Sequence, residues 1–204
     1  MTLSPRILLF SVIVLASLLS VAQVADEALD LSVAQNIEKP SVPRKAETYV
    51  RTAMDQLRRH LVKNGLDVKT IRDGEVLQVT IPCSSLFGIG SVELKASAVN
   101  ELRKLSAVVR EPHKYKVLVA VHTDDTGDNQ YADSISASRA NAIDDGLWHI
   151  AGEKDTNVIP YGIGKDEPIV PNTSRNNRER NRRVEIYIIP DIALIEMSGV
   201  KIKK

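Results

Sequence analysis

The stretch 119–127, Val-Ala-Val-His-Thr-Asp-Asp-Thr-Gly, decides how this chain folds. Residues 115–121 are apolar on both faces and rich in valine, which indicates a strand covered on both sides. Asp124 comes just past this run, where side chains emerge at the edge of a sheet. Arg139 follows fifteen residues later, in the stretch 136–140, Ser-Ala-Ser-Arg-Ala. We expect Arg139 on the next helix, at the border of its apolar face and close to Asp124.

Before this strand, the sequence predicts a helix, a hairpin and a second helix. Apolar residues recur every three or four positions from 46 to 61, which is the pattern of one helical face. Residues 68–81 form two short apolar runs around Asp73-Gly74, a strong hairpin signal. The apolar stripe at positions 94, 98, 102, 105 and 109 predicts one long helix.

After the strand, the sequence predicts a helix over 131–149, a short strand over 157–164, a short helix over 174–181 and a final strand over 183–189. Such alternation of helices and strands implies a sheet covered by helices within a single domain. The predicted fold class is therefore an α/β (α+β) sandwich that carries an extra helix and hairpin at its N-terminus.

The chain divides into five predicted segments. Residues 7–22 form an apolar run that ends in small residues, which is the anatomy of a secretory signal. This run is shorter than the ~20 apolar residues that span a bilayer, although an uncleaved anchor remains the alternative. The segments are a signal peptide or anchor over 1–22, a polar linker over 23–43, the N-terminal helix and first hairpin strand over 44–74, the main domain over 75–190, and a C-terminal tail over 191–204.

Composition and charge narrow the possible functions. Hydrophobic residues make up 43% of the chain and charged residues 26%, as in soluble globular proteins. The net charge is only +1, so no overall field draws the chain to nucleic acid. Five arginines lie between positions 175 and 183, but they lack the aromatic residues that nucleic-acid binding uses. Cys83 is the only cysteine, so we expect no internal disulfide and no cysteine-rich metal site.

Signatures of catalysis are missing from the sequence. The four histidines show no HExxH-type metal spacing, and there is no Gly-x-Ser-x-Gly turn and no phosphate-binding glycine loop. Asp124 and Asp125 are adjacent, so their side chains point apart and do not make a general acid–base pair. We therefore expect no enzymatic activity, no catalytic residue, no metal and no cofactor.

Asp124 and Arg139 form the candidate site. A carboxylate and a guanidinium that open into one cleft hold a zwitterion, because the first accepts from an ammonium and the second donates to a carboxylate. On spacing alone, the alternative is a structural salt bridge between the two side chains.

A series of ordered motifs extends from the central strand to the end of the domain. It comprises His122-Thr-Asp124-Asp-Thr-Gly127, Tyr131, Ile135-Ser136, Arg139-Ala140, Gly162-Ile-Gly164, Pro168, Asn172, Arg178 and Asn181-Arg182-Arg183-Val184-Glu185. Together these motifs resemble the OmpA-like peptidoglycan-binding domain, which OmpA shares with Pal and MotB. The resemblance covers about residues 75–190 and implies a mixed β-sheet with helices packed against it.

The resemblance also implies roles for individual residues. In that family, the aspartate and the arginine of these motifs grip the diaminopimelate of a peptidoglycan stem peptide, which corresponds here to Asp124 and Arg139. Backbone amides near Thr126 and Gly127 are expected to assist. Arg178 and Arg182 are expected to tie loops to the sheet or to border the ligand cleft.

The chain departs from the family pattern at several positions. Ala132 stands where the family usually has asparagine, and Asn177 replaces a glycine. Gly88 and Gly90 stand where some members have asparagine or acidic residues. Ala132, Gly88 and Gly90 lack side-chain groups that help to hold a ligand, whereas Asn177 is a mild change because asparagine tolerates a left-handed backbone.

Two functions follow as hypotheses. The first is noncovalent binding of peptidoglycan through diaminopimelate, by an exported protein that is periplasmic or associated with the outer membrane of a Gram-negative-type envelope. The alternative is an interaction module that docks other envelope proteins and has a degenerate ligand cleft, as Ala132, Gly88 and Gly90 suggest. The helix over 46–61 serves either as a dimerisation element or as a packed extension of the domain, and we favour the extension.

Overall fold

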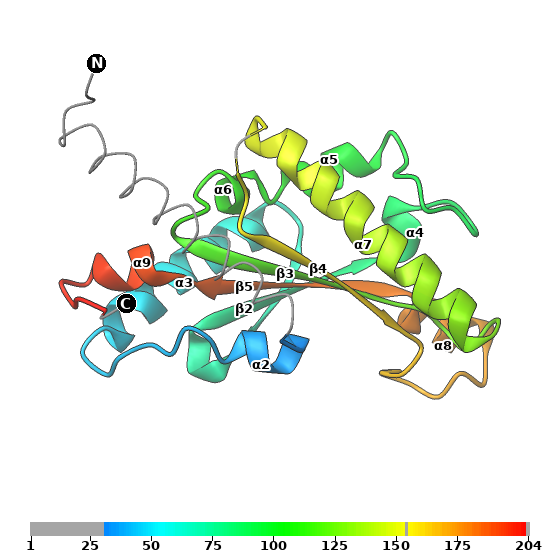
Figure 1. The fold of residues 1–204 in the computed structure, drawn as a ribbon, viewed down its shortest axis with the longest axis horizontal. Coiled ribbons are helices and arrows are strands. Elements are labelled where there is room, and N and C mark those ends of the chain that lie inside the picture. The colour runs from blue at the N-terminus through cyan, green and yellow to red at the C-terminus, as the bar shows by residue number, and fades with distance from the viewer. Residues whose placement is uncertain (1–30, 154, 203–204) are drawn as a thin grey trace, which may run out of the picture.

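The computed structural model describes residues 31–153 and 155–202. Within them, five strands form one mixed sheet in the order β1-β2-β5-β3-β4 (Figure 1). The parallel pair is β3 with β4, and the other neighbours are antiparallel. This sheet confirms the predicted fold class. The strands are β1 (Asp67–Ile71), β2 (Val76–Pro82), β3 (Tyr115–His122), β4 (Val158–Gly164) and β5 (Arg183–Pro190).

The predicted hairpin is present as β1 and β2. Its connection is the short 3-10 turn η1 (Arg72–Gly74), in which all three residues have a positive φ, reaching 86° at Gly74. Glycine adopts this left-handed backbone without a steric penalty. The turn sets the register, which pairs Val68 with Val79 and Ile71 with Val76.

One face of the sheet carries the main core. Two helices lie across it, α3 (Glu47–Lys63) and the long α7 (Asn129–Ala151) (Figure 1). The valines of β3 at odd positions, such as Val119, point into this core, because successive side chains of a strand alternate between faces. Since α3 packs in the same core, the structure agrees with a packed extension.

The stripe that predicted one long helix over 94–109 is divided in the structure. It contains two short helices, α5 (Ala98–Arg103) and α6 (Ser106–Val109), and Leu94 instead makes an isolated β-bridge with Phe87. Leu105 lies between the two helices and is still buried. The prediction of one helix was wrong because apolar residues on both sides of a break can face the same core, so periodicity does not reveal the break.

The opposite face of the sheet is covered by a segment for which the sequence predicted a linker. Residues 32–37 begin with Ser32, which caps α2 (Val33–Ile37) and forms a reciprocal capping box with Gln35. Val33 and Ile37 pack on a small apolar cluster of the sheet, made of Val76, Leu118, Ile159 and Ile189.

Two cationic side chains fix this N-terminal segment. Lys116 of β3 is buried and donates from Nζ to the Asn36 carbonyl over 2.8 Å, and also to the Lys39 carbonyl. Arg72 donates to the carbonyls of Ile37 and Pro40 over 2.6 and 3.1 Å. Residues 32–40 are thus part of the folded unit, while residues 23–30 of the expected linker lie outside the described residues.

The C-terminal end of the described chain also differs from expectation. The segment predicted as a tail begins with α9 (Ile192–Glu196), whose Leu194 and Ile195 are buried in the main core. The predicted signal or anchor over 1–22 lies outside the described residues. In the described part of the chain, no helix has the length and apolar character needed to cross a membrane.

Candidate functional site

Asp124 lies on the loop between β3 and α7, as predicted. Its side chain is almost fully buried, and Oδ1 accepts from the Thr126 amide over 2.9 Å while Oδ2 pairs with the Arg182 guanidinium. Burial alone raises the pKa of Asp124, but the Thr126 hydrogen bonds and Arg182 outweigh this and hold that pKa below its usual range. Asp124 is therefore an ionised, oriented carboxylate at neutral pH.

The loop after Asp124 has a fixed shape. Gly127 has a φ of 88°, and a Cβ at this position would lie 2.9 Å from the Tyr131 ring, so only glycine fits without a shift. Asp128 caps α7 by accepting from the Tyr131 amide over 2.8 Å. The Thr126 amide, expected to assist a ligand, donates to Asp124 instead.

Arg139 lies on α7 and is 5% exposed. It holds the loop that follows α4 (Cys83–Leu86): Nε donates to the Ser91 carbonyl over 2.9 Å and Nη2 to the Gly88 carbonyl at 3.4 Å. The guanidinium also lies over the Phe87 ring, 5.0 Å from its centroid. Throughout residues 31–153 and 155–202, Arg139 forms no ion pair, so a direct salt bridge to Asp124 is not the arrangement found.

Arg139 and Arg182, the ion-pair partner of Asp124, both lie near Cys83 at the start of α4. Cys83 donates its amide to the Arg182 carbonyl over 3.0 Å, and its Sγ lies 3.9 Å from the His122 carbonyl, two residues before Asp124. Burial raises the pKa of the Cys83 thiol to about 11, against the opposing charges of Arg139 and Arg182. Arg182, the partner of Asp124, therefore contacts the start of α4, and Arg139 holds the loop that follows α4.

Arg182 joins this site, whereas Arg178 does not. Arg182 bridges the Asp124 and Glu179 carboxylates and is 32% exposed along its side chain. Arg178 of α8 (Arg175–Asn181) donates to the Asn172 carbonyl over 2.7 Å and so holds the preceding loop. Sequence reasoning missed Glu179, although its spacing of three residues from Arg182 on one helical face was a readable signal.

Arg183 belongs to a separate buried cluster. Its Nε donates to Glu185 over 2.6 Å, and Tyr187 donates to the same carboxylate over 2.5 Å. Burial opposes ionisation of Glu185, but His122, Tyr187 and Arg183 lower its pKa to about 2. This cluster lies on the face of the sheet opposite the main core, where His122 Nε2 of β3 is 3.6 Å from the Glu185 carboxylate of β5.

Ala132 and the two loop glycines contribute no polar side chain to the site. Ala132 is fully buried in the first turn of α7, beside Gly164 at the end of β4. Gly88 and Gly90 lie in the loop that Arg139 holds, and there the backbone carbonyl of Gly88 supplies the polar contact.

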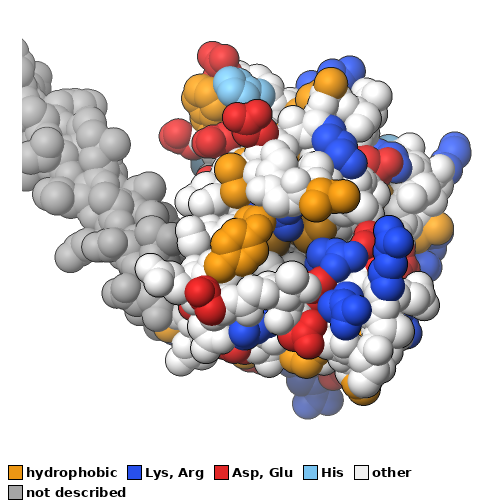
Figure 2. Space-filling model, turned by 90° about the vertical axis from the view of Figure 1, so that its right-hand side faces the viewer, with side chains coloured by type: hydrophobic (Ala, Val, Ile, Leu, Met, Phe, Trp, Pro, Cys, Tyr) orange, Lys and Arg blue, Asp and Glu red, His pale blue; other side chains and the backbone are white. Residues whose placement is uncertain are grey.

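The surroundings of the site are mixed in character. Figure 2 looks onto the end of the molecule where α7 begins and α8 lies, and basic side chains gather there beside apolar ones.

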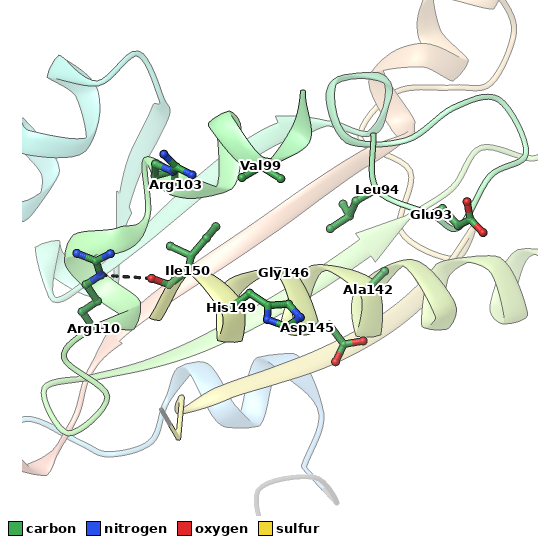
Figure 3. Close-up of a pocket in the computed structure, with 10 residues that line it drawn as sticks. All are labelled: Glu93, Leu94, Val99, Arg103, Arg110, Ala142, Asp145, Gly146, His149 and Ile150. Atoms are coloured by element: carbon green, nitrogen blue, oxygen red, sulfur yellow. Dashed lines mark hydrogen bonds between the residues drawn. The ribbon is translucent and has the colours of Figure 1, made fainter. Parts of the chain in front are cut away.

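A wide groove of about 640 Å³ lies elsewhere, between α5, α6 and α7, with Leu94, Val99 and Gly146 among its lining residues (Figure 3). Neither Asp124 nor Arg139 lines this groove. In the described part of the chain, no cluster of three or more His, Cys, Asp or Glu residues is arranged to hold a metal.

Comparison with known proteins finds similarity to one family and to envelope lipoproteins. Residues 86–182 match the model of the OmpA family. The probable lipoprotein YiaD of Escherichia coli strain K12 is 29% identical over 126 residues, which cover 62% of this chain and 57% of that protein. The outer-membrane lipoprotein YfiB of Pseudomonas aeruginosa is 31% identical over 103 residues, which cover 50% and 61%. The chain thus spans about six tenths of the length of these two relatives.

Solved structures agree with the family. A putative MotB-like protein from Desulfovibrio vulgaris has a TM-score of 0.60 at 26% identity, over 71% of this chain and 96% of that one. The cell wall anchor of the T6SS from Pseudomonas aeruginosa has a TM-score of 0.57 at 26% identity, over 66% and 97%. Residues 86–182 of this chain therefore match the OmpA family in sequence, and the fold is similar to these solved structures.

Proposed function

We propose that this chain binds cell-wall peptidoglycan noncovalently through the diaminopimelate of a stem peptide, and that it links the bacterial envelope to the wall. The observation that carries the proposal is that Arg182, the ion-pair partner of Asp124, contacts the start of α4, while Arg139 holds the loop that follows α4. A guanidinium has five N–H donors, and Arg139 uses two of them on the carbonyls of its loop. The similarity to a structure described as a cell wall anchor supports the same function.

Each charged group of the site takes one half of the ligand's zwitterion. The ammonium of diaminopimelate replaces the Arg182 guanidinium beside Asp124, and Arg182, which is partly exposed, keeps its second partner Glu179. The ligand carboxylate takes the remaining N–H groups of Arg139. Hydrogen bonds to charged groups contribute about 1.5–3 kcal/mol each, so losing one weakens binding about 10- to 100-fold.

This arrangement implies selectivity between types of wall. Lysine in place of diaminopimelate keeps the ammonium but lacks the carboxylate on the same carbon. Arg139 then gains no charged partner, and the ammonium still has to displace Arg182 from Asp124. We therefore expect diaminopimelate-containing stem peptides to bind about 10- to 100-fold more tightly than lysine-containing ones.

Titration calorimetry with purified muropeptides tests the proposal. The wild-type chain should bind the diaminopimelate form and discriminate against the lysine form, and Asp124→Asn should lose most of the affinity. Asp125→Asn is the matched control, because Asp125 is the exposed neighbour of Asp124 and is expected to bind as the wild type does. Equal affinities of wild type and Asp124→Asn for the diaminopimelate form would contradict the proposal.

The second candidate is a docking module for another envelope protein. Ala132, Gly88 and Gly90 favour it, because they leave the site without the side-chain amide and carboxylate expected there. Retention on purified sacculi supports wall binding, whereas retention only in the presence of envelope extract supports docking. Both candidates place the chain in the cell envelope, in keeping with relatives named as outer-membrane lipoproteins and porins.

A further inference from the structure

An apolar side chain stands fully in solvent beside the proposed ligand site. Ile89 is 109% exposed, which means that no other part of the described chain covers it. Single exposed apolar residues are common on protein surfaces and need no explanation by themselves. The position of Ile89 does need an explanation, because Arg139 donates hydrogen bonds to the carbonyls of Gly88 and Ser91, which lie before and after it in the chain.

The loop presents Ile89 on a rigid turn. The Ser91 amide donates to the Gly88 carbonyl over 3.2 Å, which closes a four-residue β-turn with Ile89 and Gly90 at its centre. Gly90 has a φ of 67°, as the third position of a type II turn requires. Ser91 is fixed further by hydrogen bonds between its hydroxyl and the backbone of Glu93. Ile89 is thus displayed at a corner whose backbone is already ordered.

The turn is attached directly to the residue proposed to hold the ligand carboxylate. Arg139 donates to the carbonyls of Gly88 and Ser91, which are the first and last residues of this turn. Consecutive Cα atoms are about 3.8 Å apart, so the Ile89 side chain lies within about 10 Å of the guanidinium. When the ligand carboxylate binds Arg139, the ligand atoms next to that carboxylate are therefore within reach of the Ile89 side chain.

Diaminopimelate carries apolar groups at about this distance from the end that Arg139 binds. Three methylenes separate the gripped end of diaminopimelate from the peptide backbone, and an alanine methyl comes next. We propose that Ile89 is a specificity-determining residue that packs on these methylenes and on the adjoining alanine. This inference rests on the proposed function and adds an apolar contact to the two charged ones.

Calorimetry at several temperatures tests this contact, with a diaminopimelate-containing tetrapeptide muropeptide as the probe. Ile89→Ser should raise Kd about three- to tenfold, because one or two buried methyl groups are lost. The heat-capacity change of binding should become less negative, since that quantity reports apolar burial. Ile89→Leu should stay within about twofold of the wild type. Val62→Ser, at an exposed valine of α3, is the matched control and should change nothing.

The outcomes separate this inference from the proposed function. If Ile89→Ser binds with wild-type affinity and heat capacity while Asp124→Asn loses binding, the apolar contact is refuted and the charged site stands. If the wild type binds no muropeptide, both fail together. Loss of affinity in Ile89→Leu as large as in Ile89→Ser also refutes the contact, because leucine keeps the apolar surface.

Discussion

The ion pair between Asp124 and Arg182 can be measured by a double-mutant cycle with Asp124→Asn and Arg182→Gln. The Asp124 side chain is 5% exposed and that of Arg182 is 32% exposed. The pair thus lies between surface pairs, which contribute about 0.2–1 kcal/mol, and fully buried pairs, whose rupture costs about 3–5 kcal/mol. We expect a coupling free energy of about 1–2 kcal/mol. Asp124→Asn alone should cost more than Arg182→Gln alone, because it also weakens the hydrogen bond from Thr126.

Urea unfolding followed by circular dichroism provides the four free energies of the cycle. Because the folded-state pKa of Asp124 is lowered, its stabilisation is fully present above the unfolded pKa of about 3.9. It is lost as the pH falls through the lower folded pKa. The difference in stability between wild type and Asp124→Asn should therefore shrink below about pH 4. Asp125→Asn serves as the control, because Asp125 is exposed.

A coupling free energy below about 0.3 kcal/mol at pH 7 would refute this reasoning, because independent sites add to within that margin. So would a cost of Asp124→Asn that stays constant from pH 7 to the acid limit of the folded state. Either result would mean that Arg182 does not hold the Asp124 carboxylate, and the proposed exchange of Arg182 for a ligand ammonium would lose its basis.

Three further changes probe the packing and the buried charges. Gly162→Ala should destabilise the fold by about 1–3 kcal/mol in urea unfolding, because its Cβ would lie 2.4 Å from the Ala137 amide nitrogen, and an unchanged midpoint would contradict this. Burial and the neighbouring Asp145 raise the pKa of Asp144 to about 6, so the folded state favours its protonated form. Asp144→Asn should therefore stabilise the protein at pH 7 by about 1 kcal/mol after allowance for its partial exposure, and the gain should vanish below pH 4. Burial lowers the pKa of Lys116 to about 8, so its contribution to the unfolding free energy rises from pH 8 to 10.5, and Lys116→Met should remove this rise.

The central strand and the position of Asp124 could be predicted because they depend on local signals. A continuous apolar run ends at a polar loop, and the helical phase of the next segment places Arg139 on the side of the core. The hairpin was predicted for the same reason, since Asp73-Gly74 supplies the left-handed backbone that the turn needs. These features depend on residues that are near one another in sequence.

The partners of the site residues could not be predicted in this way. Arg182 pairs with Asp124 across 58 positions, and Arg139 reaches Ser91 across 48. Such contacts follow from the strand order, in which β5 lies beside β3, and no periodicity reports that order. α2 is a different case, because the capping box of Ser32 and Gln35 was a readable signal for a helix inside the expected linker.

The charged side chains of the free site already have hydrogen-bond partners, and this lowers the affinity expected for a ligand. Asp124 already has a cationic partner in Arg182, and Arg139 already has two carbonyl acceptors. Under the proposed function, ligand binding exchanges an internal ion pair for an external one, so the net gain is smaller than the gross strength of the new contacts. A single site should then bind weakly, and tight attachment should require several sites on a repeating polymer. Arg182→Gln should accordingly raise the affinity for a diaminopimelate muropeptide while it lowers stability. A variant that lost both would show that Arg182 is itself a ligand contact.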